Sequence, residues 1–399
     1  MTDTPWLTIV GIGEDGAAGL SASARSAIAE AEIVFGASRH LALLPNLKSE
    51  AVAWPVPFEN GLDQLLVHRG RRVVMLASGD PFWFGAGTSI TRRLSADEWV
   101  ALASPSTFSL AAARLGWALE DTACVGLHAA PLTRLRPHIA VGRRAIALVR
   151  DGDAVAELAR YLRDLGLGAS HLHILEALGG PRERIREVTA DAMTFVDVAH
   201  PVAVAIAFVG HGATLPRASG LSDDWFAHDG QVTKRPIRAL TLSALAPKPG
   251  EMLWDIGAGS GSIGIEWLLS HASTQAIAFE ADPVRVARAA TNAAALGVDR
   301  LRIVQGSAPG ALKGQDLPDA IFVGGGLTDA LLDALWTLVG TGTRLVVNAV
   351  TLESEALLAR WHEAKGGTLL RIELSDAVPL GTRRGWRARY PVVQWCVAL

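Results

Sequence analysis

The stretch that most constrains the fold of this 399-residue chain runs from residue 252 to residue 280. An apolar run at 252–256 is followed by Gly257, Gly259 and Gly261, then by an apolar pattern with helical spacing, and then by a second apolar run that ends at Glu280. This order of strand, glycine turn, helix, strand and acidic residue predicts half of a nucleotide-binding α/β sheet. Glycines leave the backbone N–H groups of such a turn open to a ligand.

Two acidic residues beside this turn indicate the kind of ligand. Glu280, at the carboxyl end of the second predicted strand, is placed to accept hydrogen bonds from two ribose hydroxyls. Asp255 lies two residues before the first glycine, where a carboxylate orients the loop, can reach an ammonium group and repels a pyrophosphate. It therefore favours S-adenosylmethionine over a dinucleotide. Gly259, Gly261 and Gly264 also satisfy G-x-G-x-x-G, so an NAD(P)-dependent oxidoreductase remains an alternative.

Length and composition predict two domains with sizeable cores, because half of the residues are apolar and only 19% are charged. The N-terminus enters a strand without a basic segment, and no apolar stretch approaches the about 18–20 residues that span a bilayer. The net charge of −3 gives no nucleic-acid signature, and the two cysteines make neither a disulfide framework nor a metal cluster. We therefore expect a cytoplasmic protein without a membrane or nucleic-acid partner.

Strand and helix patterns alternate from Leu7 to about Gly210, which predicts an α/β domain at residues 1–210 with a mainly parallel sheet. The periodicity stops in a stretch rich in Gly, Pro, Ser and Asp, so we expect a linker at 211–230 and a second α/β domain at 231–399. The expected strands of the first domain are 7–13, 33–36, 72–81, 145–150, 172–177 and 202–209, and its helices include 22–32 and 153–165.

The second domain has the pattern of a methyltransferase sheet rather than that of a dehydrogenase. A helix at 234–246 precedes the glycine-turn strand, and two β-rich runs at 368–375 and 390–399 close the domain as a hairpin-like pair. Between them we expect strands at 276–280, 301–304, 319–323 and 343–348.

Three loops of the first domain are candidates for ligand contact: two follow predicted strands, and the third follows a short apolar run. They are Gly11-Ile12-Gly13, the segment from Ser78 to Gly85, and the segment 104–107. Ligands of parallel sheets lie at the carboxyl ends of strands, so three such loops together point to one site. Four histidines in this half, by contrast, are expected to be loop or surface residues rather than ligands: His128, His138, His171 and His173.

The motifs of the N-terminal half resemble those of the tetrapyrrole (precorrin) methylase family from about residue 5 to residue 210. The matching segments are VGIGEDG (10–16), LASGDPFWFGAG (76–87), SPSTFSLAAARLGW (104–117) and ILEALGGPRERI (174–185). Where the family usually has Gly-Pro-Gly, this chain has Gly13-Glu14-Asp15-Gly16. The resemblance implies a class III methylase α/β fold and an S-adenosylmethionine site at Gly13, Gly79, Asp80, Phe84, Gly85, Ser106 and Thr107.

The C-terminal half resembles the decarboxylating precorrin methylase family, densely from residue 220 to about 360. The matching segments are GLSDDWFAHDGQVTKRPIRA (220–239), DIGAGSGSIGIEW (255–267), GSAPGAL (306–312), FVGGG (322–326) and VVNAVTLES (346–354). The resemblance implies a class I Rossmann-like methyltransferase domain. It assigns to S-adenosylmethionine Thr233, Gly257, Gly259, Ser260, Gly261, Glu280, Ser307 and Ala308, the last two facing the adenine.

The substrate side of the second site is expected at the ends of later strands. Gly324, Gly325, Gly326 and Asn348 lie there and would border a tetrapyrrole. Arg383 and Arg384, within the run RRGWRAR, are either a solvated edge or a grip for substrate carboxylates, to which the planar guanidinium is suited.

The two halves in this order resemble the fused, decarboxylating precorrin methyltransferases of cobalamin biosynthesis. The resemblance implies methylation of C-5 and C-15 of precorrin-6Y with one S-adenosylmethionine per domain, loss of CO2 from the ring C acetate to give precorrin-8, and a homo-oligomer. Bridge carbons of a reduced tetrapyrrole are enamine-like nucleophiles, so the protein mainly has to align them with the methyl donor. We therefore assign no catalytic residue and no metal. A methyltransferase with one degenerate half is the second alternative.

Overall fold

The computed structural model describes residues 5–399. The chain forms two compact units: the first reaches to Thr214, and the second runs from Leu215 to Leu399 and takes in the short segment Thr133–Pro137. Both are α/β units, as expected, and each has its own hydrophobic core. No helix within residues 5–399 is long and apolar enough to cross a membrane.

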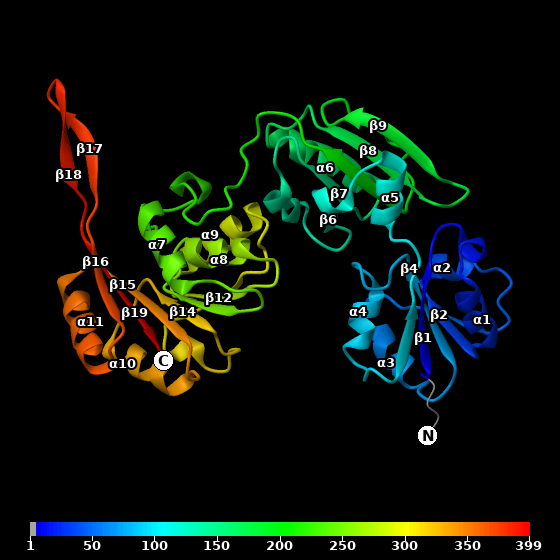
Figure 1. Ribbon diagram of the computed structural model, residues 1–399, viewed down its shortest axis with the longest axis horizontal. Helices are drawn as coiled ribbons and strands as arrows, with labels where there is room; N and C mark the ends of the chain where they lie inside the picture. The colour runs from blue at the N-terminus through cyan, green and yellow to red at the C-terminus, as the bar shows by residue number, and fades with distance from the viewer. Residues whose placement is uncertain (1–4) are drawn as a thin grey trace. The chain divides into compact units, whose positions relative to one another are not determined.

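The first sheet of unit 1 is wholly parallel, with the strand order β3-β2-β4-β1-β5. Its strands are β1 (Leu7–Ile12), β2 (Ile33–Gly36), β3 (Glu50–Ala53), β4 (Val73–Ser78) and β5 (Trp99–Leu102). Strands β1, β2 and β4 are apolar at nearly every position because helices cover both faces of the sheet (Figure 1). One face carries α1 (Ala22–Glu30) and α2 (Ser38–Ala42), and the other carries α3 (Asn60–Leu66) and α4 (Ala86–Thr91).

The second sheet of unit 1 has the order β6-β7-β10-β8-β9, and only β6 and β7 pair in parallel. Its strands are β6 (Thr122–Gly126), β7 (Arg144–Leu148), β8 (His171–Glu176), β9 (Arg184–Thr189) and β10 (Val202–Ala207). The expectation of one mainly parallel sheet for residues 7–210 is wrong at this point. The connection 177–183 between β8 and β9 is too short for a helical crossover, so these strands pair antiparallel.

Two further helices of unit 1 begin at side-chain caps. Ser106 Oγ accepts from the backbone N–H of Ser109 at the start of α5 (Thr107–Leu115), and Asp151 Oδ1 accepts from that of Ala154 at the start of α6 (Gly152–Asp164). Such caps satisfy N–H groups that have no partner inside the helix. Helix α5 packs on the second sheet and lies next to the predicted ligand loop at 104–107.

Unit 2 has the sheet order expected for a methyltransferase: β13-β12-β11-β14-β15-β19-β16. Strands β11 to β15 pair with one another in parallel, and β19 runs antiparallel between β15 and β16, which confirms the expected late pair of strands. The strands are β11 (Met252–Ile256), β12 (Gln275–Glu280), β13 (Arg302–Gln305), β14 (Ala320–Val323), β15 (Arg344–Ala349), β16 (Thr368–Ile372) and β19 (Val392–Ala398).

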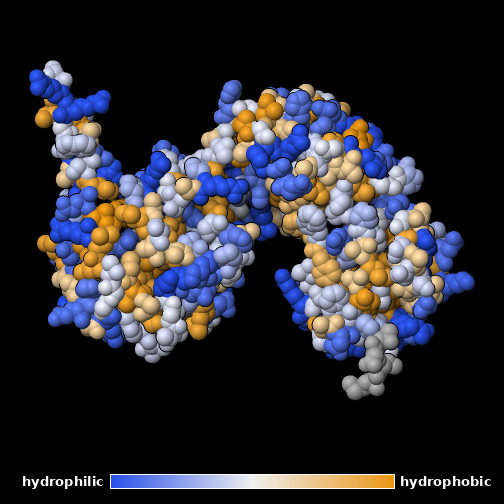
Figure 2. Space-filling model, viewed as in Figure 1, coloured by the Kyte–Doolittle hydropathy of each residue, from blue (hydrophilic) through white to orange (hydrophobic). Residues whose placement is uncertain are grey.

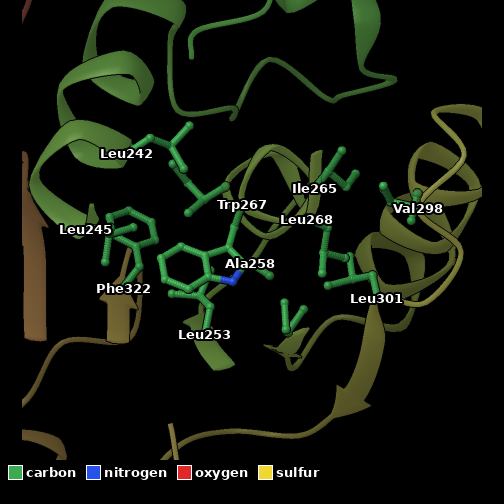
Figure 3. Close-up of a cluster of buried hydrophobic side chains, with 14 of the residues drawn as sticks. Leu242, Leu245, Leu253, Ala258, Ile265, Trp267, Leu268, Val298, Leu301 and Phe322 are labelled. Carbon is green, nitrogen blue, oxygen red and sulfur yellow. The ribbon is translucent and has the colours of Figure 1, made fainter. Parts of the chain in front are cut away.

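Helices cover both faces of this sheet (Figure 1). One face carries α7 (Arg235–Leu245), α8 (Ser262–Ser270) and α9 (Pro283–Ala295), and the other carries α10 (Asp329–Leu338) and α11 (Leu352–Lys365). Figure 3 shows the core under the first group, where Trp267 of α8 lies among Leu242, Leu253 and Phe322. The Trp267 indole N–H donates to the carbonyl of Gln275 at 2.9 Å, so this side chain ties α8 to the start of β12.

A hairpin of two strands, β17 (Ser375–Leu380) and β18 (Arg383–Ala388), projects from the sheet of unit 2 between β16 and β19 (Figure 1). The sequence pattern does not predict this hairpin, because its residues lack a sustained apolar alternation. Figure 2 shows hydrophilic residues gathered on its projecting end, where Arg383 and Arg384 are exposed. Trp386 is 79% exposed on the same hairpin.

Candidate functional site

The glycine turn of unit 2 lies between β11 and α8, and its backbone requires glycine. Gly257, Gly259 and Gly261 have φ values of 72°, 58° and 76°, in the left-handed region that other residues rarely adopt. A Cβ on Gly257 would lie 2.7 Å from the backbone nitrogen of Gly325. The turn therefore packs directly on the glycine loop after β14, and no side chain fits between the two loops.

Glu280 lies at the end of β12 and is only 7% exposed. One of its carboxylate oxygens accepts from the backbone N–H of Gly259 at 2.8 Å, and the other accepts from the N–H of Asp282 at 3.0 Å. The two bonds fix the orientation of the carboxylate, yet each oxygen keeps a lone pair for another donor. The geometry therefore fits two adjacent hydroxyls, as a ribose presents them.

Asp255 is buried beneath the turn and does not line the cavity. Its Oδ2 accepts from the backbone N–H of Gly264 at 2.9 Å, in the first turn of α8, so the side chain orients the loop as the sequence predicts. Burial, together with the nearby Glu280 carboxylate, raises the pKa of Asp255 from 3.8 to about 7. Asp255 Oδ1 and Ser260 Oγ are buried and have no hydrogen-bond partner within residues 5–399.

The raised pKa of Asp255 predicts a pH-dependent stability of unit 2. The folded protein favours the neutral form of Asp255. The contribution of this carboxyl group to the free energy of unfolding is therefore fully present below about pH 4 and is lost as the pH rises through about 7. We expect Asp255→Asn, which keeps a carbonyl oxygen for Gly264, to gain stability relative to the unchanged protein by up to about 1.4 kcal/mol per pH unit across this range. Urea unfolding at pH 5 and pH 8 measures the difference, and parallel pH dependences would contradict it.

A cavity of about 680 Å³ opens beside the turn at the carboxyl ends of the parallel strands. It brings together eleven predicted residues: Thr233, Gly257, Gly259, Ser260, Glu280, Ser307, Ala308, Gly324, Gly325, Gly326 and Asn348. Asp255 and Gly261 were also predicted but do not line the cavity. Asp255 orients the turn through its bond to Gly264, and Gly261 is the residue at which α8 begins. The cradle of glycines and the oriented carboxylate of Glu280 fit S-adenosylmethionine.

The structure does not bring Arg383 and Arg384 to the cavity; they lie in the projecting hairpin. Arg389, from the same basic run, lines the cavity instead, and its guanidinium forms two hydrogen bonds of 2.6 and 2.7 Å with the Asp376 carboxylate. The sequence interpretation names Arg389 as one of the four arginines of the run but assigns only Arg383 and Arg384 to the substrate, because nothing in a charge pattern distinguishes a hairpin strand from the residues that follow it. Arg285 and Tyr390 also line the cavity and were not predicted.

Unit 1 contains a second cavity, of about 340 Å³, to which both of its sheets contribute. All seven predicted residues of this unit line it: Gly13, Gly79, Asp80, Phe84, Gly85, Ser106 and Thr107. Gly79 has a φ of 53°, and a Cβ there would lie 2.9 Å from the carbonyl oxygen of Pro105. Phe84 has a φ of 56° without being glycine, a strained conformation of the kind that gathers at binding loops.

Six polar residues of this cavity were not among the predicted ligand residues: Glu14, Arg39, His40, Ser78, His128 and His200. His128 lies at an exposed turn position, as expected for a loop residue, and also borders this cavity. His40 is buried, its Nε2 lies 3.0 Å from Ser78 Oγ, and burial with the nearby Arg39 lowers its pKa to about 4. A lone histidine in a helical pattern gives no signal for such a position, since only the packing of α2 on β4 creates it.

The chain has a glycine-lined cavity in each unit. The cavity of unit 2 lies at a seven-stranded sheet with the strand order of a methyltransferase, and Glu280 ends the strand that follows the glycine turn. Together these features define the protein as a methyltransferase. Comparison with known proteins agrees. Residues 6–194 match the model of the tetrapyrrole (corrin/porphyrin) methylases, and residues 224–399 match the precorrin methyltransferase domain.

The sequence matches curated relatives along almost its whole length. It is 48% identical to precorrin-6Y C(5,15)-methyltransferase (decarboxylating) from a Sinorhizobium species. The match covers 98% of this chain and 96% of that relative. It is 42% identical to the protein of that name from Mycobacterium tuberculosis strain CDC 1551, over 98% of this chain and 99% of the relative. The chain therefore belongs to the precorrin-6Y C5,15-methyltransferase (decarboxylating) family, a family of S-adenosylmethionine-dependent enzymes that methylate a tetrapyrrole. Membership decides against the oxidoreductase alternative.

A solved structure corresponds to the second half of the chain. The C-terminal domain of precorrin-6Y C5,15-methyltransferase from Rhodobacter capsulatus is 49% identical, with a TM-score of 0.45, and covers 46% of this chain and 100% of that one.

Proposed function

We propose that each unit binds one S-adenosylmethionine, so that unit 1 methylates C-5 of the substrate and unit 2 methylates C-15 and releases the ring C acetate as CO2. The observation that carries this proposal is that each unit has its own cavity, lined by the loops that the sequence predicts. The family-model matches to residues 6–194 and 224–399 support two catalytic domains, with the second beginning inside the stretch 211–230 that the sequence predicts as a linker.

In unit 2, Glu280 would hold the ribose, and Ser307 and Ala308 would face the adenine. The bound sulfonium supplies an electrophilic methyl group. The chain's part is alignment: the glycine turn and the loop at 324–326 approach each other so closely that the cavity wall where they meet is formed by backbone. A flat macrocycle can then lie against this wall, which places a bridge carbon in line with the donor.

In unit 1, the loops after β1, β4 and β5 would hold the second donor. Ser104 Oγ donates to the carbonyl of Gly11 at 2.7 Å, and Gly79 N–H donates to the carbonyl of Ile12 at 3.0 Å. These bonds join the three loops at one edge of the sheet. Rigid loops of this kind preserve the position of a ligand through the reaction.

The outer carboxylates of the tetrapyrrole are suited to arginines, because a guanidinium offers two parallel N–H groups to a carboxylate. Arg389 at the cavity and Arg383 and Arg384 on the hairpin are the candidates. Cytoplasmic location and assembly into a homo-oligomer remain predictions that the family resemblance supports.

The number of donor sites can be counted by calorimetry with S-adenosylmethionine and the full-length protein. We expect two sites per chain, and one site in Gly79→Ala, because a Cβ at Gly79 meets the Pro105 carbonyl in a left-handed turn. Gly70→Ala is the matched control, since its φ is 84° but a Cβ there meets no atom within 4 Å. A single site in the unchanged protein would support the hypothesis that one half is degenerate. The absence of binding would refute both this hypothesis and that of one donor site per unit.

A further inference from the structure

Three neutral polar side chains form a buried cluster next to the cavity of unit 2. Thr241 comes from α7, Asn348 from the end of β15 and Gln394 from β19, where it pairs with Asn348 across the antiparallel ladder. Thr241 is 0% exposed and Gln394 is 3% exposed. Asn348 is the member of this cluster that lines the cavity.

The hydrogen bonds fix the direction of every donor in this cluster. Thr241 Oγ1 donates its proton to the carbonyl of Ile237 at 2.8 Å, so towards its other neighbours it can only accept. It accepts from Asn348 Nδ2 at 2.9 Å and from Gln394 Nε2 at 3.2 Å. The second N–H of Gln394 then donates to Asn348 Oδ1 at 2.9 Å, so the Asn348 amide has one possible orientation.

One donor of the cluster stays unused. Each amide nitrogen carries two N–H groups, and those of Gln394 are both taken. Asn348 Nδ2 uses one on Thr241, and within residues 5–399 the other has no protein partner. Because Asn348 borders the cavity, this N–H is available to a ligand there.

The cavity wall near this donor is apolar. Ile237, Ile372 and Val392 form a small cluster with Leu374, and all four line the cavity. The charged residues of the lining are engaged elsewhere: Lys234 Nζ with the carbonyl of Gly230, Arg285 with Asp229, Arg389 with Asp376 and Glu280 with the backbone of the turn. Beside these apolar side chains, the free N–H of Asn348 is a neutral donor with a fixed direction.

We propose that Asn348 binds the carboxylate of the ring C acetate that leaves as CO2, and that Thr241 and Gln394 are positioning residues for its amide. The proposal rests on the proposed function of unit 2. One neutral N–H orients a carboxylate but stabilises its charge far less than a guanidinium would. A carboxylate held among apolar side chains loses its hydration, and loss of CO2 moves the charge from the carboxylate into the macrocycle.

The reaction balances with a proton from water. The bond between the methylene carbon and the carboxylate carbon breaks, and CO2 leaves. The electron pair stays on the methylene carbon in conjugation with a protonated ring imine. A proton then adds to this carbon, so that the acetate becomes a methyl group. Asn348 acts by holding the carboxylate in place while the breaking bond stands out of the plane of the ring.

The test compares Asn348→Asp with the unchanged full-length protein, using precorrin-6Y and S-adenosylmethionine labelled in its methyl group. Replacing the N–H by a carboxylate oxygen opposes two like charges, so we expect CO2 release to fall at least about tenfold. The affinity for S-adenosylmethionine and the methylation of C-5 by unit 1 should stay within about twofold. Asn60→Asp, which adds the same charge at an exposed position of unit 1, is the control.

The positioning residues are tested by rescue. Thr241→Val removes the acceptor that orients the amide and should lower the rate of CO2 release at saturating substrate, whereas Thr241→Ser keeps the hydroxyl and should restore it. A loss of stability alone would appear in both the melting temperature and the donor affinity, which are measured in parallel.

Two results would overturn the subsite while leaving the proposed function intact. One is CO2 release within twofold of the unchanged protein in Asn348→Asp with normal donor binding. The other is a Thr241→Ser variant that is as impaired as Thr241→Val. Failure of the unchanged protein to release any CO2 would instead refute the function proposed for unit 2.

Discussion

Glu280→Ala is expected to abolish C-15 methylation and CO2 release while C-5 methylation continues. The variant removes both oxygens proposed for the ribose, and each hydrogen bond to a charged group is worth about 1.5–3 kcal/mol. Loss of two such bonds weakens donor binding in unit 2 by about 100-fold or more. The variant also frees the N–H of Gly259, which the carboxylate holds at 2.8 Å, so the glycine turn loses its orientation as well.

The measurement uses the full-length chain, with the two methyl positions assigned by NMR and CO2 counted separately. Glu280→Gln keeps one carbonyl oxygen and should show an intermediate affinity for the donor. Glu353→Ala, at an exposed position of α11, is the matched control. Unchanged CO2 release in Glu280→Ala would refute the assignment of the second site, and loss of both methylations together would refute the independence of the two sites.

Arg238→Met should destabilise unit 2 more than any surface substitution. Arg238 is 0% exposed, and its guanidinium pairs with Glu266 at 2.5 Å and with Asp223 at 3.1 Å. It also donates to the carbonyls of Leu221 and Thr233. Removing the cation leaves the buried Glu266 carboxylate without its partner, which costs about 3–5 kcal/mol. Because Thr233 lines the cavity, donor binding in unit 2 should weaken in parallel.

Denaturant unfolding of the full-length protein measures this effect, with the transition of unit 1 as an internal reference. Adding Glu266→Gln to Arg238→Met removes the stranded charge and should recover part of the lost free energy. The control is Arg302→Met, which breaks an exposed ion pair with Asp316 and should cost at most about 1 kcal/mol. Equal destabilisation by Arg238→Met and Arg302→Met would show that the buried pair does not organise the unit.

The strands and helices that the sequence predicts are those with a sustained apolar period. The glycine turn is predicted with its ligand residues because each element is local: an apolar strand, glycines at alternate positions and an acid at the end of the next strand. The sequence analysis does not predict β3, β5, β6, β9 or the hairpin β17–β18, since their stability comes from pairing with a neighbour rather than from their own pattern.

The candidate site divides in the same way. Residues contributed by motifs, such as Glu280 and Gly79, are predicted by number and line the cavities. His40 and Arg389 are not, because their positions follow from how α2 packs and where a hairpin ends. Gln394 illustrates the limit most clearly: its partner Asn348 is 46 residues away, and only the antiparallel insertion of β19 brings the two amides together.

The position of β19 also bears on how the protein is made. This strand, residues 392–398, lies inside the sheet between β15 and β16, so unit 2 cannot complete its core until these residues have left the ribosome. Unit 1 draws on no residue beyond Thr214 and can fold while unit 2 is still being translated. A nascent chain that stops before β19 would thus carry a folded unit 1 and a sheet of unit 2 with an open edge, which makes incomplete translation products candidates for aggregation and proteolysis.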